Sequence, residues 1–262
     1  MNKLNRFFAK NPWFSYLVTG LLLTIFWLGY FFAEYSLTAT IIFSIAVVII
    51  YPLLPLGAAN KLSIEAAKKL RDECDPYPLL LETQDQLTYV KNIGRRQLIM
   101  MDYASALNGI GKSDEAYENL CSINLDLNLG ATIETRAVYY FGMSNLSLEV
   151  GKYEESLSYH TKASQIAGAI KNKKLKESIF SSLRTVAAEQ AIYRKDYDTA
   201  ISLLSTVEDK NKITSVSKAF LYGKIAIAQG NTEAAKNNLL FVINNGNKLG
   251  CVEQARQILA TL

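Results

Sequence analysis

The chain has very little of the chemistry that metal and disulfide sites use. Its 262 residues include one histidine and three cysteines. Cys74, Cys121 and Cys251 are far apart and form no C-x-x-C pair, whereas a zinc site needs three or four clustered ligands. An odd, sparse set of cysteines also argues against a disulfide framework built in an oxidising compartment. We therefore expect no metal, no cofactor and three reduced thiols.

Motifs that mark catalytic sites are also missing. The sequence contains no G-x-S-x-G, no H-E-x-x-H and no complete G-x-x-x-x-G-K-[ST] phosphate-binding loop. The single histidine, His160, has no partner residues that would make it a ligand or a general base, so we interpret it as a partly buried packing residue. We predict that the protein is not an enzyme, and we expect no catalytic residue and no small-molecule substrate.

Two long stretches lack charge altogether. Residues 13–32 are uncharged, and after a short break residues 36–56 are uncharged as well. A helix of about 20 apolar residues is roughly 30 Å long, which matches the hydrocarbon core of a bilayer. The apolar region of a cleaved signal peptide is shorter, ~7–15 residues. We predict a transmembrane hairpin with helices over residues 13–32 and 36–56.

Basic residues flank the predicted hairpin on one side only, because the connecting turn carries Glu34 and no basic residue. The flanking basic residues are Lys3, Arg6, Lys10, Lys61, Lys68, Lys69 and Arg71. The positive-inside rule then places residues 1–12 and the whole C-terminal part in the cytoplasm, with the protein integral to the cell membrane and in contact with its lipid. No ionisable residue lies within either span, which argues against a transporter or channel.

Residues 57–76 are expected to form an amphipathic linker helix. Leu62, Ala66 and Leu70 recur at helical spacing with basic residues between them. Such a helix either lies on an anionic lipid leaflet or is an ordinary linker with a solvated basic face. After residue 60 the chain holds 25 of its 28 basic and 23 of its 24 acidic residues. This near balance predicts no nucleic-acid partner.

Residues 77–262 contain one pattern four times: a helix, a turn residue, and a second helix with a small residue five positions after the turn. The turn residues are Gly111, Gly151, Lys195 and Gly230, and the small residues are Ala116, Ser156, Ala200 and Ala235. First helices are predicted over residues 131–150, 176–194 and 216–229, and a last helix over 251–262 should cap the open end. No alternating strand pattern appears, so the predicted fold class is all-α.

This pattern resembles the tetratricopeptide repeat, a helix–turn–helix unit of about 34 residues. Tyr153 and Tyr197 stand where that family keeps an aromatic residue after the turn. The turn residues are 40, 44 and 35 positions apart, so only the last interval is near the usual length. The resemblance implies an α-solenoid over residues 77–262, with a concave groove that is lined by the first helices and holds a peptide or a helix.

On that resemblance, the polar and aromatic residues of the inner wall are the candidate partner-binding residues. They are Asn145, Glu149, Glu189, Tyr193 and Lys224. A ligand gripped by its terminal carboxylate is not expected, because Glu149 and Glu189 would oppose it. A wet, nonspecific groove, or one filled by the protein's own chain, is the alternative.

Together these features predict a membrane-anchored scaffold or adaptor that binds a protein or peptide partner at the cytoplasmic membrane face. Tethering raises the local concentration of whatever the scaffold binds. The alternative is a regulatory subunit that recognises a membrane transporter or protease through its transmembrane hairpin.

Overall fold

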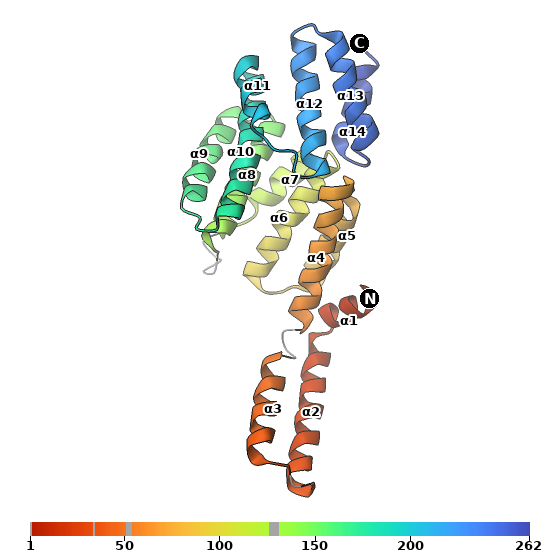
Figure 1. The fold of residues 1–262 in the computed structure, drawn as a ribbon, viewed down its shortest axis with the longest axis vertical. Helices are drawn as coiled ribbons and strands as arrows, with labels where there is room; N and C mark the ends of the chain where they lie inside the picture. The colour runs from red at the N-terminus through yellow and green to blue at the C-terminus, as the bar shows by residue number, and fades with distance from the viewer. Residues whose placement is uncertain (1, 34, 51–53, 126–130) are drawn as a thin grey trace. The chain divides into compact units, whose positions relative to one another are not determined.

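The fold is entirely helical wherever the structure describes it. The computed structural model describes residues 2–33, 35–50, 54–125 and 131–262. These residues form 14 helices and no strand (Figure 1). The all-α prediction is confirmed for this part of the chain.

The chain divides into two compact units, Met1–Glu65 and Ala66–Leu262. The first unit contains α1 (Asn2–Lys10), α2 (Pro12–Phe32), α3 (Leu37–Ile50) and the start of α4 (Leu54–Glu73). The turn residue Glu34 and residues 51–53, near the end of the second predicted span, lie outside the described residues.

One helix of the first unit is long and apolar enough to cross a membrane. It covers Trp13–Phe32, and only 11% of its apolar window is buried within the structure. It is therefore not a core helix of the unit that contains it. α3 has 14 residues, which span about 21 Å at ~1.5 Å each, short of a bilayer core. The structure thus shows one helix of spanning length.

α2 and α3 meet along small polar and aromatic side chains. Thr19 and Thr40 are 9% and 0% exposed, and Phe26 stacks on Phe43 with ring centroids 3.5 Å apart. The Thr19 hydroxyl donates to the carbonyl of Ser15 at 2.8 Å, so its burial leaves no unpaired donor. Small residues such as these let two helix backbones approach closely.

The second unit, here called the helical domain, is built from successive helix pairs. After the end of α4 its helices are α5 (Tyr77–Tyr89), α6 (Ile93–Gly109), α7 (Ser113–Cys121), α8 (Ile133–Glu149), α9 (Tyr153–Gly168), α10 (Lys173–Tyr193), α11 (Tyr197–Ser205), α12 (Lys212–Ala228), α13 (Thr232–Asn245) and α14 (Gly250–Leu259). The pairs α6–α7, α8–α9, α10–α11 and α12–α13 are the four predicted units (Figure 1).

Each pair turns at the residue that the sequence pattern singled out. Gly111, Gly151, Lys195 and Gly230 all have positive φ, between 61° and 83°. In each case the next amide donates to the carbonyl five residues before it, as Lys112 does to Leu107 at 2.9 Å. This is the Schellman arrangement, which satisfies the last carbonyls of the first helix. The four turns therefore share one geometry.

Small residues five positions after each turn are fully buried. Ala116, Ser156, Ala200 and Ala235 are all 0% exposed. They let the second helix approach the first closely enough for core packing. His160 stands in a position that is leucine in the other three pairs. Its Nε2 lies 3.2 Å from the Leu183 carbonyl, and the partial burial expected for it is confirmed.

The α8–α9 pair uses serines where the others use apolar small residues. The hydroxyl of Ser144 donates to the carbonyl of Ser156 at 2.9 Å, and the hydroxyl of Ser156 donates to the carbonyl of Ser144 at 2.7 Å. Gln190 of α10 donates to the Ser156 hydroxyl at 2.8 Å. The buried hydroxyls are thus paired, which removes the cost of burying them.

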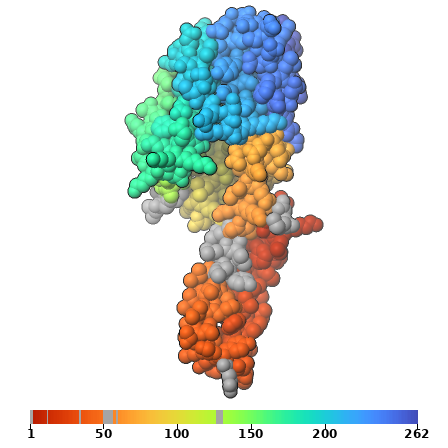
Figure 2. Space-filling model, viewed as in Figure 1, coloured from red at the N-terminus to blue at the C-terminus, as the bar shows by residue number. Residues whose placement is uncertain are grey.

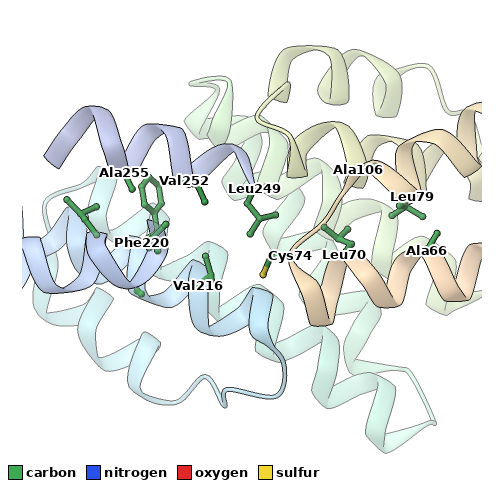
Figure 3. Packing of buried hydrophobic residues seen from close by; sticks show 13 residues of the cluster. Ala66, Leu70, Cys74, Leu79, Ala106, Val216, Phe220, Leu249, Val252 and Ala255 are labelled. Carbon is green, nitrogen blue, oxygen red and sulfur yellow. The ribbon is translucent and has the colours of Figure 1, made fainter. Parts of the chain in front are cut away.

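The helical domain closes on itself. Its largest core cluster joins residues of α4 to α6 with residues of α12 to α14, and Cys74 and Leu249 lie at the junction (Figure 3). In the space-filling view the blue C-terminal helices lie against the light-orange residues that follow Ala66 (Figure 2). Val216 and Val252, 0% and 2% exposed, belong to the same cluster.

Polar contacts reinforce this closure. The amide of Lys248 donates to the carbonyl of Cys74 at 3.2 Å, and its Nζ lies 2.7 Å from Oδ2 of Asp75. The side chain of Asn247 donates to the carbonyl of Glu73 at 2.9 Å. The last helix was predicted to cap an open end; instead its start is fastened to the beginning of the domain.

The segment predicted as a linker contributes to this core. Ala66 and Leu70 of α4 are 6% and 8% exposed and belong to the closing cluster, while Lys68, Lys69 and Arg71 face solvent. The compact domain therefore starts at Ala66, ahead of the boundary expected after residue 76. Because this apolar face is covered by protein, the structure favours a packed helix over one that lies on a leaflet.

Replacing Gly250 with alanine should loosen the closure. A Cβ at Gly250 would lie 2.6 Å from both the Cα and the amide nitrogen of Gly111, and neither backbone atom can move aside easily. We expect Gly250→Ala to cost about 1–3 kcal/mol and to lower the thermal unfolding midpoint by several degrees, measured by circular dichroism. Gly168→Ala is the matched control, since nothing lies within 4 Å of its added Cβ. Equal midpoints for both variants would show that this contact is not made.

Candidate functional site

The five predicted site residues lie on the inward faces of three first helices. Asn145 and Glu149 are one turn apart on α8, Glu189 and Tyr193 are one turn apart on α10, and Lys224 lies on α12. Residues four positions apart share a helix face. Because α8, α10 and α12 follow one another in the stack, these faces converge.

A hollow of about 180 Å³, partly open to solvent, lies between helices of the helical domain, and we call it the inner cavity. Its wall comes from α6, α7, α8, α10, α12 and α14. The lining residues are Asn108, Gly109, Gly111, Ser113, Asn145, Glu149, Thr185, Glu189, Ile213, Ser217, Phe220, Leu221, Leu249, Cys251 and Gln254. An α-helix with its side chains is about 10–12 Å across, so the cavity is too small for a partner helix.

A second hollow, here called the rim pocket, shares two lining residues with the inner cavity. It measures about 210 Å³ and is lined by Leu148, Glu149, Glu189, Ile192, Tyr193 and Lys224. Glu149 and Glu189 line both hollows. The two carboxyl groups therefore stand where the rim pocket meets the inner cavity.

Lys224 is held by one of these carboxylates. Its Nζ lies 2.8 Å from Oε1 of Glu189 and 4.9 Å from the ring centroid of Phe220. Burial by itself would lower the pKa of Lys224, but the attraction of Glu189 and Glu149 outweighs burial and raises the pKa. The lysine is therefore charged and already paired.

Glu149 makes no hydrogen bond or ion pair with any residue that the structure describes. Its side chain is accessible, yet it stands in a concavity where protein replaces much of the surrounding water. This desolvation and the repulsion of Glu189 raise the pKa of Glu149 from 4.5 to about 7, and Lys224 offsets part of the rise. A carboxyl group that titrates near neutrality and lacks a partner is a typical feature of a functional site.

Tyr193 marks the outer edge of the rim pocket. It is 60% exposed, and its ring stacks on Tyr153 with centroids 4.7 Å apart and planes 11° apart. Stacking fixes one face of the Tyr193 ring and leaves the other open. A large exposed aromatic held in one orientation is well suited to contact a partner.

The structure thus brings all five predicted residues to two adjoining hollows, and their binding of a partner stays a prediction. Sequence reasoning missed five polar groups of the inner cavity: Asn108, Ser113, Ser217, Cys251 and Gln254. Ser217 shares the inward face of α12 with Lys224, so helical spacing could have identified it. Cys251 and Gln254 lie on α14, and no local signal places that helix at the cavity.

The thiol of Cys251 in the inner cavity is not activated as a nucleophile. Burial, chiefly, raises the pKa of the Cys251 thiol to about 11, so it is protonated at neutral pH and a poor nucleophile. Within the described ranges, no three His, Cys, Asp or Glu side chains form a group that could hold a metal ion.

The segment that ends in Gly111, Lys112 and Ser113 carries the last residues of a phosphate-binding loop. Here, however, it joins two helices instead of a strand and a helix. Lys112 pairs with Glu115 at 2.7 Å, and Ser113 donates to Asn108 at 3.0 Å. These contacts account for both side chains within a helix turn.

No protein-family model, curated protein or solved structure matches this chain. Its class therefore follows from its own geometry. Over its described residues the protein is all-helical, its domain is consistent with a helical-repeat solenoid, and one described helix near the N-terminus is of membrane-spanning length.

The titration of Glu149 tests the electrostatics of the site. We expect a midpoint near 7 by NMR of the labelled carboxyl carbon. Glu189→Gln should lower this pKa because a like charge is removed, and Lys224→Met should raise it because an attracting charge is removed. An ordinary midpoint near 4.5 in the native chain would contradict the described environment.

The raised pKa of Glu149 also makes the stability of the fold depend on pH. Because the folded-state pKa exceeds the unfolded value, the folded state binds the proton more tightly between pH 4.5 and 7. The ionised carboxyl thus destabilises the fold above pH 7. Glu149→Gln should raise the denaturant midpoint at pH 8, and this gain should vanish at pH 4.5.

Proposed function

We propose that this protein is a membrane-anchored, tetratricopeptide-like scaffold that holds a protein partner at the cytoplasmic membrane face. The observation that carries the proposal is the convergence of Asn145, Glu149, Glu189, Tyr193 and Lys224 on adjoining hollows. Three separate helix pairs supply them, and one carboxyl group is left without a partner. Polar groups with spare hydrogen-bonding capacity on a rigid wall favour recognition of another molecule.

The repeat geometry supports the family part of the proposal. Four positive-φ turns, four small residues at 0% exposure and the paired first and second helices recur in one register. A single helix pair cannot bury its apolar stripe, so stacking is what stabilises such a chain. Rigid stacked walls then position side chains for a partner.

The anchor part rests on composition and exposure. α2 is apolar, little of it is buried, and α3 is apolar and lies against it. We propose that α2 and the segment of residues 36–56 both cross the bilayer, with basic residues on the cytoplasmic side of each span. The helical domain then faces the cytoplasm.

The alternative function is a regulatory subunit that recognises a transporter or protease through the hairpin. One observation favours it: Gly20 and Thr24, one turn apart on α2, are exposed, and nothing lies within 4 Å of a Cβ built at Gly20. Small residues on an exposed helix face allow another transmembrane helix to approach closely.

A photo-crosslinker in place of Tyr193 should capture the partner. We expect p-benzoylphenylalanine at this position, in the full chain in its native membrane, to give a light-dependent adduct with a defined protein. The matched control is the same substitution at Phe241, an exposed aromatic on α13 that lines neither hollow. Identical adducts from both positions, or none from position 193, would argue against the inner wall as the binding surface.

Exchange of the hairpin distinguishes the scaffold function from the regulatory-subunit function. If residues 1–53 are replaced by an unrelated anchor, a scaffold should still give the adduct at position 193. A regulatory subunit that depends on its hairpin should lose its partner.

Thiol labelling tests the topology. Cys121 is exposed in the helical domain, so a membrane-impermeant maleimide should label it only after the membrane is permeabilised. A cysteine introduced as Ser36→Cys, between α2 and α3, should be labelled on intact cells. Labelling of Cys121 from outside intact cells would reverse the proposed orientation.

A further inference from the structure

The charged residues at the junction of the two hollows are not balanced. Among the described residues that line the inner cavity and the rim pocket, the only charged side chains are Glu149, Glu189 and Lys224. Lys224 is paired with Glu189 at 2.8 Å. Glu149 is therefore a surplus acceptor in a place that disfavours an unpaired charge.

The unpaired carboxyl group of Glu149 favours a ligand with a positive charge. An anion would meet two carboxyl groups and a lysine that is already paired, so it is disfavoured. A cation with N–H donors would neutralise Glu149 and relieve its repulsion with Glu189. Asn145, which makes no side-chain hydrogen bond within the described structure, lines the same cavity and offers a further acceptor.

The size of the hollows limits what enters. The inner cavity, about 180 Å³, is comparable to the ~150 Å³ cavity that accepts a benzene ring. It suits one side chain and not a folded element. The rim pocket continues outward from the same two carboxyls to Leu148, Ile192 and the open face of Tyr193. This apolar edge suits the residue next to the one that enters.

We propose that the junction of the inner cavity and the rim pocket binds the side chain of a lysine or arginine in an extended segment of the partner protein. The ammonium or guanidinium group donates to Glu149 and Glu189, and the adjoining residue of the partner contacts Tyr193. This inference rests on the proposed scaffold function and names the chemistry of its partner.

Lys224 has a defined role in this scheme, because it competes with the ligand for Glu189. Its removal frees a second carboxylate for the incoming cation. Lys224→Met should therefore tighten binding, whereas Glu149→Gln should weaken it. A lysine that served the ligand directly would show the opposite sign.

Binding should also weaken as the pH falls, because protonated Glu149 no longer attracts a cation. The titratable groups that face Glu149 are Glu189 on α10, Lys224 on α12 and Cys251 on α14. Lys224 stays charged and Cys251 stays neutral across pH 6 to 8, since the pKa of each is raised. The loss of affinity between pH 8 and pH 6 should therefore follow Glu149.

The test uses the full chain in lipid nanodiscs and the peptide acetyl-Gly-Ser-Arg-Ser-Gly-amide, with affinity measured by saturation-transfer NMR. The same peptide with citrulline in place of arginine is the uncharged control. We expect Glu149→Gln to weaken binding at least about tenfold, as for the loss of a hydrogen bond to a charged group. Lys224→Met should strengthen it several-fold. Glu233→Gln changes the net charge equally at an exposed site on α13 and should have no effect.

Equal binding of the arginine and citrulline peptides, or unchanged affinity in Glu149→Gln, would overturn the proposal. Weaker binding in Lys224→Met would overturn it as well. If that variant fails to fold, the Glu149→Gln and pH measurements still decide the matter. If the crosslinker at position 193 captures a protein but the peptide does not bind, the scaffold function stands and basic recognition is wrong. If the peptide binds as expected but no protein is captured, the site is real and the scaffold function fails.

Discussion

The contact between the start and the end of the helical domain is the constraint on which its interior depends. The corner after α4 and the turn before α14 share a core around Cys74 and Leu249, and Gly250 lies against the backbone of Gly111. An open solenoid would present its inner wall to solvent as a long groove. Closure shortens that groove to a small hollow that is partly open to solvent, and α14 supplies one of its walls. Part of the groove is thus occupied by the protein's own chain, which limits a partner to a narrow segment.

One charged group at the junction of the two hollows is electrostatically unfavourable, and packing does not explain its presence. Elsewhere in the domain, some buried polar groups are paired, as in the reciprocal bonds of Ser144 and Ser156, whereas others, such as the hydroxyl of Ser147, have no hydrogen-bond partner among the described residues. Glu149 is different, because desolvation and the nearby Glu189 both disfavour its charge. Folded proteins tolerate such groups mainly where a ligand or a reaction uses them, since stability and function compete at the same position. The four turns of the domain thus repeat one backbone geometry, whereas the unfavourable charge of Glu149 at the cavity does not follow from the repeat.

Much of the fold could be predicted from local signals. The four turn residues have the positive φ that favours glycine, and the small residues beneath them are buried. Helices over residues 133–149, 173–193 and 212–228 begin and end within a few residues of their predicted bounds. The five candidate residues of the inner wall came from the resemblance to the tetratricopeptide repeat, and in the structure they line the two hollows. Two features could not be predicted from local signals. Ala66 and Leu70 contribute to the core, and Cys251 and Gln254 line the inner cavity. These depend on contacts between segments more than 170 residues apart, such as Lys248 with Asp75.

The sequence by itself therefore determined the all-helical class, the repeated turn and the long apolar helix. Each of these depends on spacing within a few residues: helical periodicity, backbone conformation at a turn, or the length of an apolar run. Only the tertiary structure decided that the domain closes, that Glu189 pairs with Lys224 while Glu149 has no partner among the described residues, and that the groove narrows to a small hollow. Those outcomes follow from how distant helices meet, because desolvation and ion pairing depend on distances in space that no local pattern specifies.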